Sequence, residues 1–199
     1  MKFSTIAKVA GTLMLTMGLA GCFDMTQDIR VTSTETATAT ITTTMSADIY
    51  PMIKAGAAGD DAEPFCEEDG ASLTENADGS ATCVLVSEGK FDELDFDDDD
   101  GSSSKPVFTA NADGTVRIAV PTKDMMGELG SEELDEQTKA MMQQLFEGRY
   151  LTLRFGGSEL VDTNMDDVGD GYAESKMSFL DLINGTIELP EELYAVVRP

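Results

Sequence analysis

The sequence predicts an α+β fold, a twisted antiparallel sheet of hairpins with two or three helices packed on one face. Three observations support this prediction. Short segments alternate apolar with polar residues, as strands with one buried face do. Turn sequences containing Asn and Gly separate these segments, which favours hairpins. A few longer stretches carry apolar residues at helical spacing. We expect a single domain over residues 28–199, long enough to bury a real core.

The first two expected strands form the longest hairpin. Residues 28–33 place Ile29 and Val31 on one face, and the turn-like Ser33-Thr34-Glu35 follows. Residues 36–46 then alternate small or apolar residues with threonines, and this period of two predicts a half-buried strand. A threonine-rich, glycosylated stalk is the competing interpretation of this segment.

Two segments carry helix signals. Residues 47–58 are expected to be helical, with Asp48 as the cap and Pro51 in the first turn. Residues 131–148 carry the strongest signal, because Ser131 is a natural N-cap and apolar residues recur on one face.

The remaining strands follow turn signals. The loops Asn76-Ala77-Asp78-Gly79 and Asn111-Ala112-Asp113-Gly114 share one pattern, and each predicts a hairpin because Asn and Gly tolerate positive φ. Between them, residues 92–105 carry a run of acidic residues followed by Gly and Ser, which predicts an exposed, mobile loop. Further strands are expected at residues 150–155, 159–162, 172–177 and 193–197.

The amino-terminal segment has the features of an export signal. Lys2 and Lys8 accompany an apolar run over residues 9–21, which is shorter than the ~20 residues of a membrane-spanning helix. The small residues of Leu19-Ala20-Gly21, directly before Cys22, resemble the lipobox of bacterial lipoproteins. That resemblance implies cleavage before Cys22 and attachment of lipid chains such as palmitate to this residue. An ordinary secretory signal followed by a chance cysteine is the alternative.

These features predict where the protein resides. We expect residues 1–21 to be a signal peptide, Cys22 to be the lipid anchor and residues 22–27 to be a short tether. The domain would then lie close to a membrane outside the cytoplasm. This is the periplasmic face of the inner or outer membrane, or the outer face of the plasma membrane in a Gram-positive cell.

The charge of the chain excludes one class of partner. The sequence holds 13 basic and 38 acidic residues, and loss of Lys2 and Lys8 leaves 11 basic residues and a formal charge of −27. Nucleic acid would be repelled. An anionic membrane surface would also repel the domain, so the lipid anchor must hold it there. Solubility of an exported protein is the simpler reason for this acidity.

Cys66 and Cys83 are expected to form a disulfide bond. An exported chain meets an oxidising compartment, where such pairs close. The closed loop of about 18 residues would contribute roughly 3 kcal/mol in the chain-entropy model. Two free thiols or a metal-binding pair are the alternatives, although the chain has no histidine to complete a zinc site.

The sequence argues against an enzyme. Without histidine it lacks the commonest general base, and neither Ser-His-Asp nor Cys-His machinery can form. It has no Gly-x-x-x-x-Gly-Lys phosphate loop and no Gly-x-Ser-x-Gly elbow. A carboxylate pair acting on cell-wall sugars is the weakest alternative, because so many acidic residues form pairs by chance. We expect no catalytic residues and no cofactor.

Two groups of residues are candidates for ligand binding. Asp95, Asp97 and Asp99 supply oxygen ligands at alternate positions, which suits weak calcium binding, and residues 162–170 form a second oxygen-rich stretch. Solvated acidic loops are the alternative in both places. Met141, Met142 and Leu145 could line a lipid groove beneath the helix at 131–148, because thioether side chains adapt to varied apolar ligands. An ordinary core is the alternative for these three.

The order of these parts resembles the LppM-type bacterial lipoprotein domain. A lipobox cysteine is followed by Asp28-Ile29-Arg30-Val31, then by a long central helix, and Val161-Asp162-Thr163-Asn164 precedes a late strand. The resemblance covers most of residues 22–199. It implies a membrane-anchored, non-enzymatic α+β domain that binds membrane lipids or glycolipids, with no catalytic residues to carry over. The insertion with Cys66, Cys83 and the Asp run departs from the pattern.

The function predicted is therefore binding or handling of lipid, or of another apolar envelope molecule. The alternative is an interaction module that docks on an envelope protein complex. An apolar pocket behind Met141, Met142 and Leu145 would favour the first. A closed core with an exposed flat patch or a bare sheet edge would favour the second.

Overall fold

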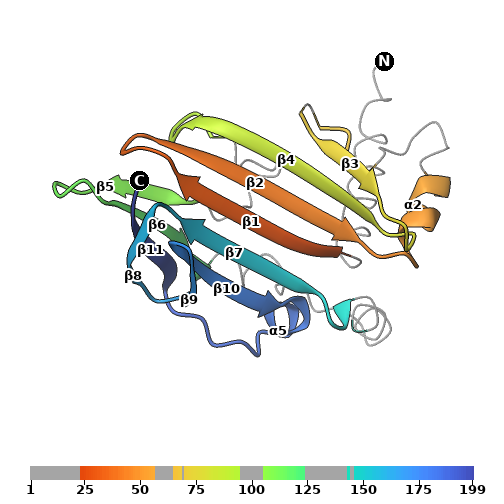
Figure 1. Ribbon diagram of the computed structural model, residues 1–199. Coiled ribbons are helices and arrows are strands. Elements are labelled where there is room, and N and C mark those ends of the chain that lie inside the picture. Colours follow the sequence, from red (N-terminus) through yellow and green to blue (C-terminus); the bar gives the residue numbers. More distant parts are fainter. Residues whose placement is uncertain (1–22, 57–64, 69, 95–104, 124–142, 144–145) are drawn as a thin grey trace, which may run out of the picture.

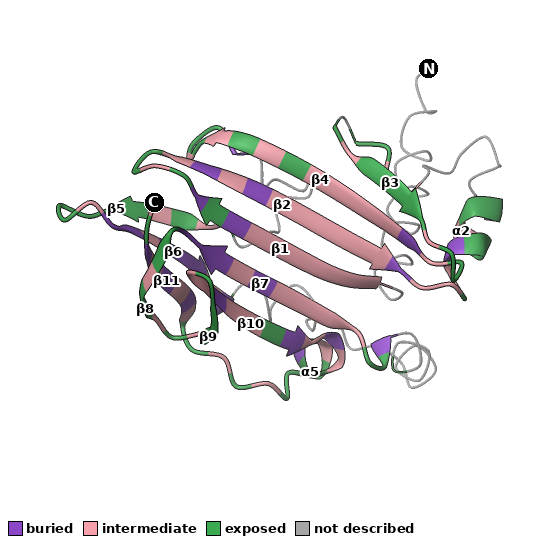
Figure 2. Cartoon of the chain, viewed as in Figure 1, coloured by how far each residue is buried: buried purple, intermediate pink, exposed green. Residues whose placement is uncertain are grey.

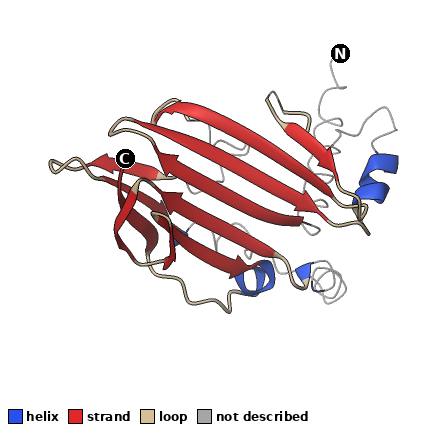
Figure 3. Ribbon diagram, viewed as in Figure 1, coloured by secondary structure: helices blue, strands red, loops and turns tan. Residues whose placement is uncertain are grey.

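The computed structural model describes residues 23–56, 65–68, 70–94, 105–123, 143 and 146–199 of the 199-residue chain (Figure 1). The described part is an α+β fold of two sheets, with the short helices α2 (Tyr50–Gly56) and α5 (Phe179–Asn184) (Figure 3). The fold class predicted from the sequence is confirmed. The strands form two sheets instead of the expected one.

The larger sheet has seven strands. Their order is β3 (Ser72–Glu75), β4 (Ala81–Lys90), β2 (Thr36–Met45), β1 (Phe23–Val31), β7 (Tyr150–Gly156), β10 (Tyr172–Ser178) and β9 (Asp166–Gly169). Pairing is antiparallel except between β1 and β7, which run parallel with residues 25–30 beside residues 151–156. The sequence predicted an antiparallel sheet, and this one parallel pair was not foreseen, because alternation along a strand does not show which distant strand lies beside it.

The smaller sheet has four strands, all paired antiparallel. Their order is β5 (Val107–Ala110), β6 (Val116–Pro121), β11 (Glu192–Arg198) and β8 (Glu159–Thr163). The strands predicted at residues 150–155, 159–162, 172–177 and 193–197 correspond to β7, β8, β10 and β11.

The two Asn-x-Asp-Gly loops form hairpins with the same hydrogen bonds. In the loops at residues 76–79 and 111–114, the backbone N–H of the Asn donates to the backbone carbonyl four positions later, at 2.8 Å in both loops. Each Asp also accepts from the hydroxyl and the backbone amide two positions later, and these bonds lower the pKa of Asp78 and of Asp113 because they favour the carboxylate. The predicted hairpins, β3–β4 and β5–β6, are confirmed.

The main core lies between the two sheets. Figure 2 shows buried positions gathered along β1, β7, β6 and β11 toward the end where β1 stops. The larger sheet contributes Ile29, Phe155 and Ala173, each 0% exposed, and the smaller sheet contributes Ile118 and Val197 at the same exposure. Helix α5 adds Leu182 to this cluster.

A second, smaller core lies at the opposite end of β2. It consists of Met45, Tyr50 and Ala81, with Ile49, Ile53 and Phe65 packed against it. Tyr50 opens helix α2, so this cluster attaches the helix to the large sheet.

Several expected boundaries are corrected. Residues 23–27, expected as a tether, form the first half of β1, because Phe23 pairs with Met45 and the ladder is continuous from there. The helix expected at 47–58 begins only at Tyr50. The turn expected at Asn184-Gly185 is the end of α5, with Gly185 in the left-handed conformation. The helix expected at 131–148 lies largely outside the described residues.

The two sheets meet closely where β7 leads into β8. Ser158 N donates to Arg198 O at 2.8 Å, which brings the end of β11 against the turn. A Cβ atom on Gly157 would lie 2.2 Å from that same carbonyl oxygen, so only glycine fits at this position.

Replacing Gly157 by Ala should lower the free energy of unfolding by roughly 1–3 kcal/mol or more, because backbone must move to relieve the clash. Urea unfolding of the purified protein measures this. Gly89→Ala is the matched control, because its Cβ would meet Glu93 at an ordinary 3.6 Å. That variant should be neutral or more stable by about 0.5–1 kcal/mol. Equal stability of the two variants would contradict the proposed packing at the corner.

Candidate functional site

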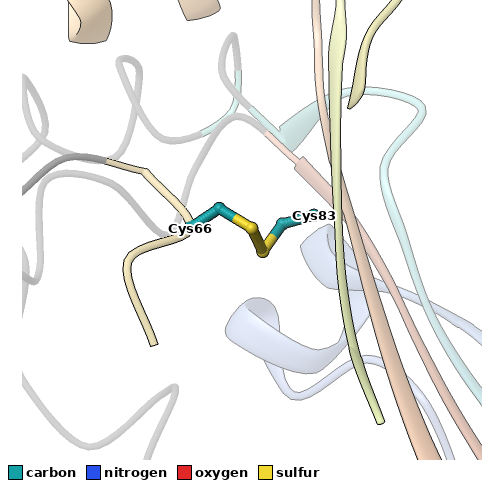
Figure 4. The surroundings of a disulfide bond; sticks show 2 residues. All are labelled: Cys66 and Cys83. Carbon is teal, nitrogen blue, oxygen red and sulfur yellow. A yellow bond between two sulfur atoms is a disulfide. The ribbon is translucent and has the colours of Figure 1, made fainter. Parts of the chain in front are cut away.

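The structure contains the predicted disulfide bond. Cys66 and Cys83 are joined, with their Cα atoms 5.5 Å apart. Figure 4 shows the bond linking the loop that carries Cys66 to the strand that carries Cys83, which is β4. The bond therefore attaches residues 65–68 to the large sheet.

The same loop supports helix α2. The Phe65 and Tyr50 rings meet edge to face with centroids 6.1 Å apart. The Tyr50 hydroxyl donates to Glu75 Oε1 at 2.6 Å, and Lys54 forms an ion pair with the same oxygen. These partners lower the pKa of Glu75, the Lys54 ammonium most strongly and the Tyr50 hydroxyl next. Helix α2 is thus fixed to β3 through one carboxylate.

The first residues of β1 are equally well fixed. Asp24 accepts a hydrogen bond from Tyr150 N at 2.9 Å and forms an ion pair with Arg149 at 3.2 Å. The Phe23 ring lies 6.1 Å from Phe179, centroid to centroid. Cys22 lies outside the described residues, but one peptide bond joins it to Phe23. An anchor on Cys22 would therefore hold this end of the molecule against the membrane.

We call this the proximal end. It comprises the start of β1, the end of β2, helix α2, residues 65–68 and Phe179. Figure 1 shows α2 and α5 at the end of the large sheet where β1 begins, and the C-terminus at the other end.

The outer face of the large sheet carries a cluster of charged residues. Asp28, Arg154 and Glu174 stand side by side on β1, β7 and β10. Arg154 Nη1 lies 3.1 Å from Asp28 Oδ2, and its Nε lies 3.3 Å from Glu174 Oε2. The Nε atom is buried and its contact with Glu174 lacks hydrogen-bond geometry. One arginine thus connects three strands.

Tyr172 completes this outer cluster. Its ring lies beneath the guanidinium of Arg154 at 4.8 Å and near that of Arg30 at 5.6 Å, and its hydroxyl accepts from Arg30 at 3.3 Å. The ring lies across Gly156, where a Cβ atom would approach it to 2.4 Å. The two arginines balance the charges of Asp28 and Glu174, so the direct effect of the cluster is to hold the strands together.

The pKa of Asp28 is shifted by its position in the cluster. Burial raises its pKa, since the charged form loses solvation, and this outweighs the lowering by Arg154 and Arg30. Sequence reasoning missed this cluster. The alternation of residues 28–31 was the available signal, but it does not show that β7 and β10 bring Arg154 and Glu174 beside Asp28.

The inner face of the large sheet extends beyond the main core. The face that carries Ile29 and Phe155 continues toward the proximal end. There it carries large apolar side chains that are only half-buried. These are Met25, Ile41, Leu85 and Leu151, which we call the inner apolar strip. Of the four, Leu151 packs against the main core. Phe146, just before β7, is 2% exposed and its ring lies 5.4 Å from Phe179.

The other predicted site residues belong to segments that the structure does not describe. Met141, Met142 and Leu145 lie outside the described residues, as do Asp95, Asp97 and Asp99. In the part of the chain that the structure describes, no three acidic or cysteine side chains are grouped to hold a metal ion.

In the second oxygen-rich stretch, two side chains have structural partners. Asn164 accepts from Tyr194 N at 2.8 Å and donates to Glu192 O at 2.7 Å, while Asp162 accepts from the Tyr194 hydroxyl at 3.0 Å. These bonds attach β8 and the residues after it to β11.

Comparison with known proteins identifies a similar fold. The chain is similar to the folded domain of LppM from Mycobacterium tuberculosis, solved by NMR, with a TM-score of 0.51 and 10% sequence identity. The alignment covers 89% of this chain and 90% of that domain. The resemblance predicted from the order of parts is thus confirmed at the level of the fold. Residue roles cannot be carried across at this identity.

No protein-family model and no curated protein sequence matches the chain. Among the described helices, none has both the length and the apolar character needed to cross a bilayer.

Asp28 gives a pH prediction with a defined sign. The pKa of Asp28 is higher in the folded protein than in the unfolded chain. The contribution of Asp28 to the free energy of unfolding is therefore fully present below the pKa of the unfolded chain, and it is lost as pH rises through the pKa of the folded protein. Asp28→Asn never ionises, so its stability relative to the unaltered protein should increase as pH rises through the ordinary pKa of aspartate and up to the raised pKa of Asp28. Urea unfolding at several pH values measures the difference.

Asp78→Asn is the control of opposite sign. The pKa of Asp78 is lowered by its hydrogen bonds to Ser80. Its contribution to the free energy of unfolding is therefore present above the pKa of the unfolded chain, and it is lost as pH falls through the pKa of the folded protein. This variant should lose stability relative to the unaltered protein as pH rises. Slopes of the same sign for both variants would refute the assignment for Asp28.

Proposed function

We propose that this chain is an exported bacterial envelope lipoprotein, anchored through Cys22, whose domain binds lipid or another apolar envelope molecule. The signal-like residues 1–21, the lipobox-like Leu19-Ala20-Gly21-Cys22 and the fold shared with the LppM domain support the proposal. The proposed role is non-enzymatic, and no residue is assigned to catalysis.

The observation that carries the binding role is the inner apolar strip. The inner face of the large sheet carries four large apolar side chains that stay half-buried. They lie toward the end of the sheet where the chain enters β7 after residue 146. Residues 131–148 carry the candidate ligand residues Met141, Met142 and Leu145 immediately before this point. Each methylene group that a ligand buries there would contribute about 0.8 kcal/mol. The strongly negative charge disfavours anionic headgroups, so the proposed ligand is neutral or zwitterionic.

The anchor is tested by Cys22→Ser in cells. The variant should leave the membrane fraction, because the only acylated residue is lost, and mass spectrometry should find acyl chains on Cys22 of the unaltered protein. Thr74→Ser, a conservative change at an exposed position of β3, should leave membrane fractionation unchanged. Membrane pelleting and acylation that persist in Cys22→Ser would overturn the anchor.

The binding role is tested with neighbouring residues on opposite faces of β4. Leu85 belongs to the inner apolar strip, whereas Val86 points to the outer face and is 49% exposed. Leu85→Asn should lower uptake of a fluorescent phosphatidylcholine, which is a zwitterionic probe, by about tenfold, while Val86→Asn should leave it unchanged. Circular dichroism checks that both fold. A lipid-free protein that takes up no probe, or equal loss in both variants, would argue against an inner-face ligand.

One observation favours the alternative role as a docking module. Strand β3 pairs only with residues 81–84 of β4, and no described strand pairs with the remaining edge at residues 85–90. An open edge can accept a strand from a partner. This role is preferred if the binding test fails.

A further inference from the structure

Helix α2 exposes an apolar side chain that the fold does not use. Met52 is 67% exposed, the highest value among the large apolar side chains of the described residues, and Pro51 and Ala55 beside it are also exposed. No acidic residue occurs from residue 49 to residue 59, although the chain holds 38. An exposed apolar segment without acidic residues, in so acidic a protein, is a candidate for contact with something apolar.

The position of α2 identifies that contact. Phe23, one peptide bond after Cys22, pairs with Met45, and α2 begins five residues later. The chain from Met45 to Tyr50 spans at most about 17 Å. Figure 3 shows α2 projecting beyond the end of the large sheet at which β1 starts. A bilayer that holds acyl chains attached to Cys22 therefore faces the end that presents Met52.

The helix is held rigidly in this place. Tyr50 is buried, its hydroxyl is bonded to Glu75, and Lys54 pairs with the same carboxylate. The disulfide bond fixes the loop that brings Phe65 against Tyr50. The orientation of Met52 is thus set by the fold.

We propose that helix α2 is a membrane contact, in which Met52 enters the interfacial region of the lipid bilayer that holds the Cys22 anchor. The inference rests on the anchor proposed above. The contact is apolar and not electrostatic, because Lys54 is neutralised by Glu75 and the nearby Asp48, Glu67 and Glu68 are acidic and exposed. It fixes how the domain stands on the membrane.

Fluorescence offers a direct test because the chain has no tryptophan. Met52→Trp places one indole on α2. Val107→Trp places one on β5, where Val107 is 55% exposed. Strand β5 lies toward the opposite end of the fold from α2 (Figure 1). In acylated protein on phosphatidylcholine vesicles, brominated lipid should quench the indole on α2 and leave the indole on β5 unchanged. Equal quenching of the two indoles, or no quenching of the one on α2, would overturn the contact.

A second measurement separates this contact from the native anchor. The chain beginning at Cys22 is coupled through that thiol to a single synthetic acyl chain, which by itself gives marginal membrane binding. Met52→Asp should then lower partitioning into phosphatidylcholine vesicles by about tenfold or more, and Val107→Asp should not change it. An unchanged partition for Met52→Asp refutes the contact. Absence of native acylation refutes only the anchor, because the synthetic chain still tests α2.

Discussion

The parallel pairing of β1 with β7 is the interaction on which the rest of the structure depends. It joins the amino-terminal strands β3, β4, β2 and β1 to the carboxy-terminal strands β7, β10 and β9 in one sheet. Both faces reinforce it. On the outer face Arg154 contacts Asp28 and Glu174, and on the inner face Ile29 and Phe155 are fully buried side by side. Breaking this pair would divide the sheet and open the core between the two sheets.

The same pairing bears on the anchor proposed at Cys22. Asp24 is held by Tyr150 and Arg149, so strand β1 is fixed to β7 from its first residues. A lipid on Cys22 would hold the domain directly against the bilayer, with a defined end toward it. The membrane contact that we propose for α2 depends on this rigid placement, because a surface can contact the membrane reproducibly only if the domain cannot swing away.

The two faces of the large sheet differ in chemistry. The outer cluster has as many positive as negative charges, and each charge is engaged within the cluster or with Tyr172. The inner face is largely apolar, and toward the proximal end it carries the half-buried side chains of the inner apolar strip. The binding role and the membrane contact that we propose therefore depend on the inner face and the proximal end, whereas the outer cluster mainly stabilises the sheet on which both are built.

The sequence by itself determined the local features of this protein. Alternation predicted the β1–β2 hairpin, the Asn-x-Asp-Gly loops predicted two further hairpins, and the two later cysteines predicted the bond that the structure contains. Each depends on residues that are close in sequence or on a chemical property of one residue type. Only the tertiary structure decided that β1 lies beside β7, that Asp28 meets Arg154 and Glu174, and that α2 stands at the end of the large sheet where β1 begins. These relations bring together distant segments through packing, which no local pattern records.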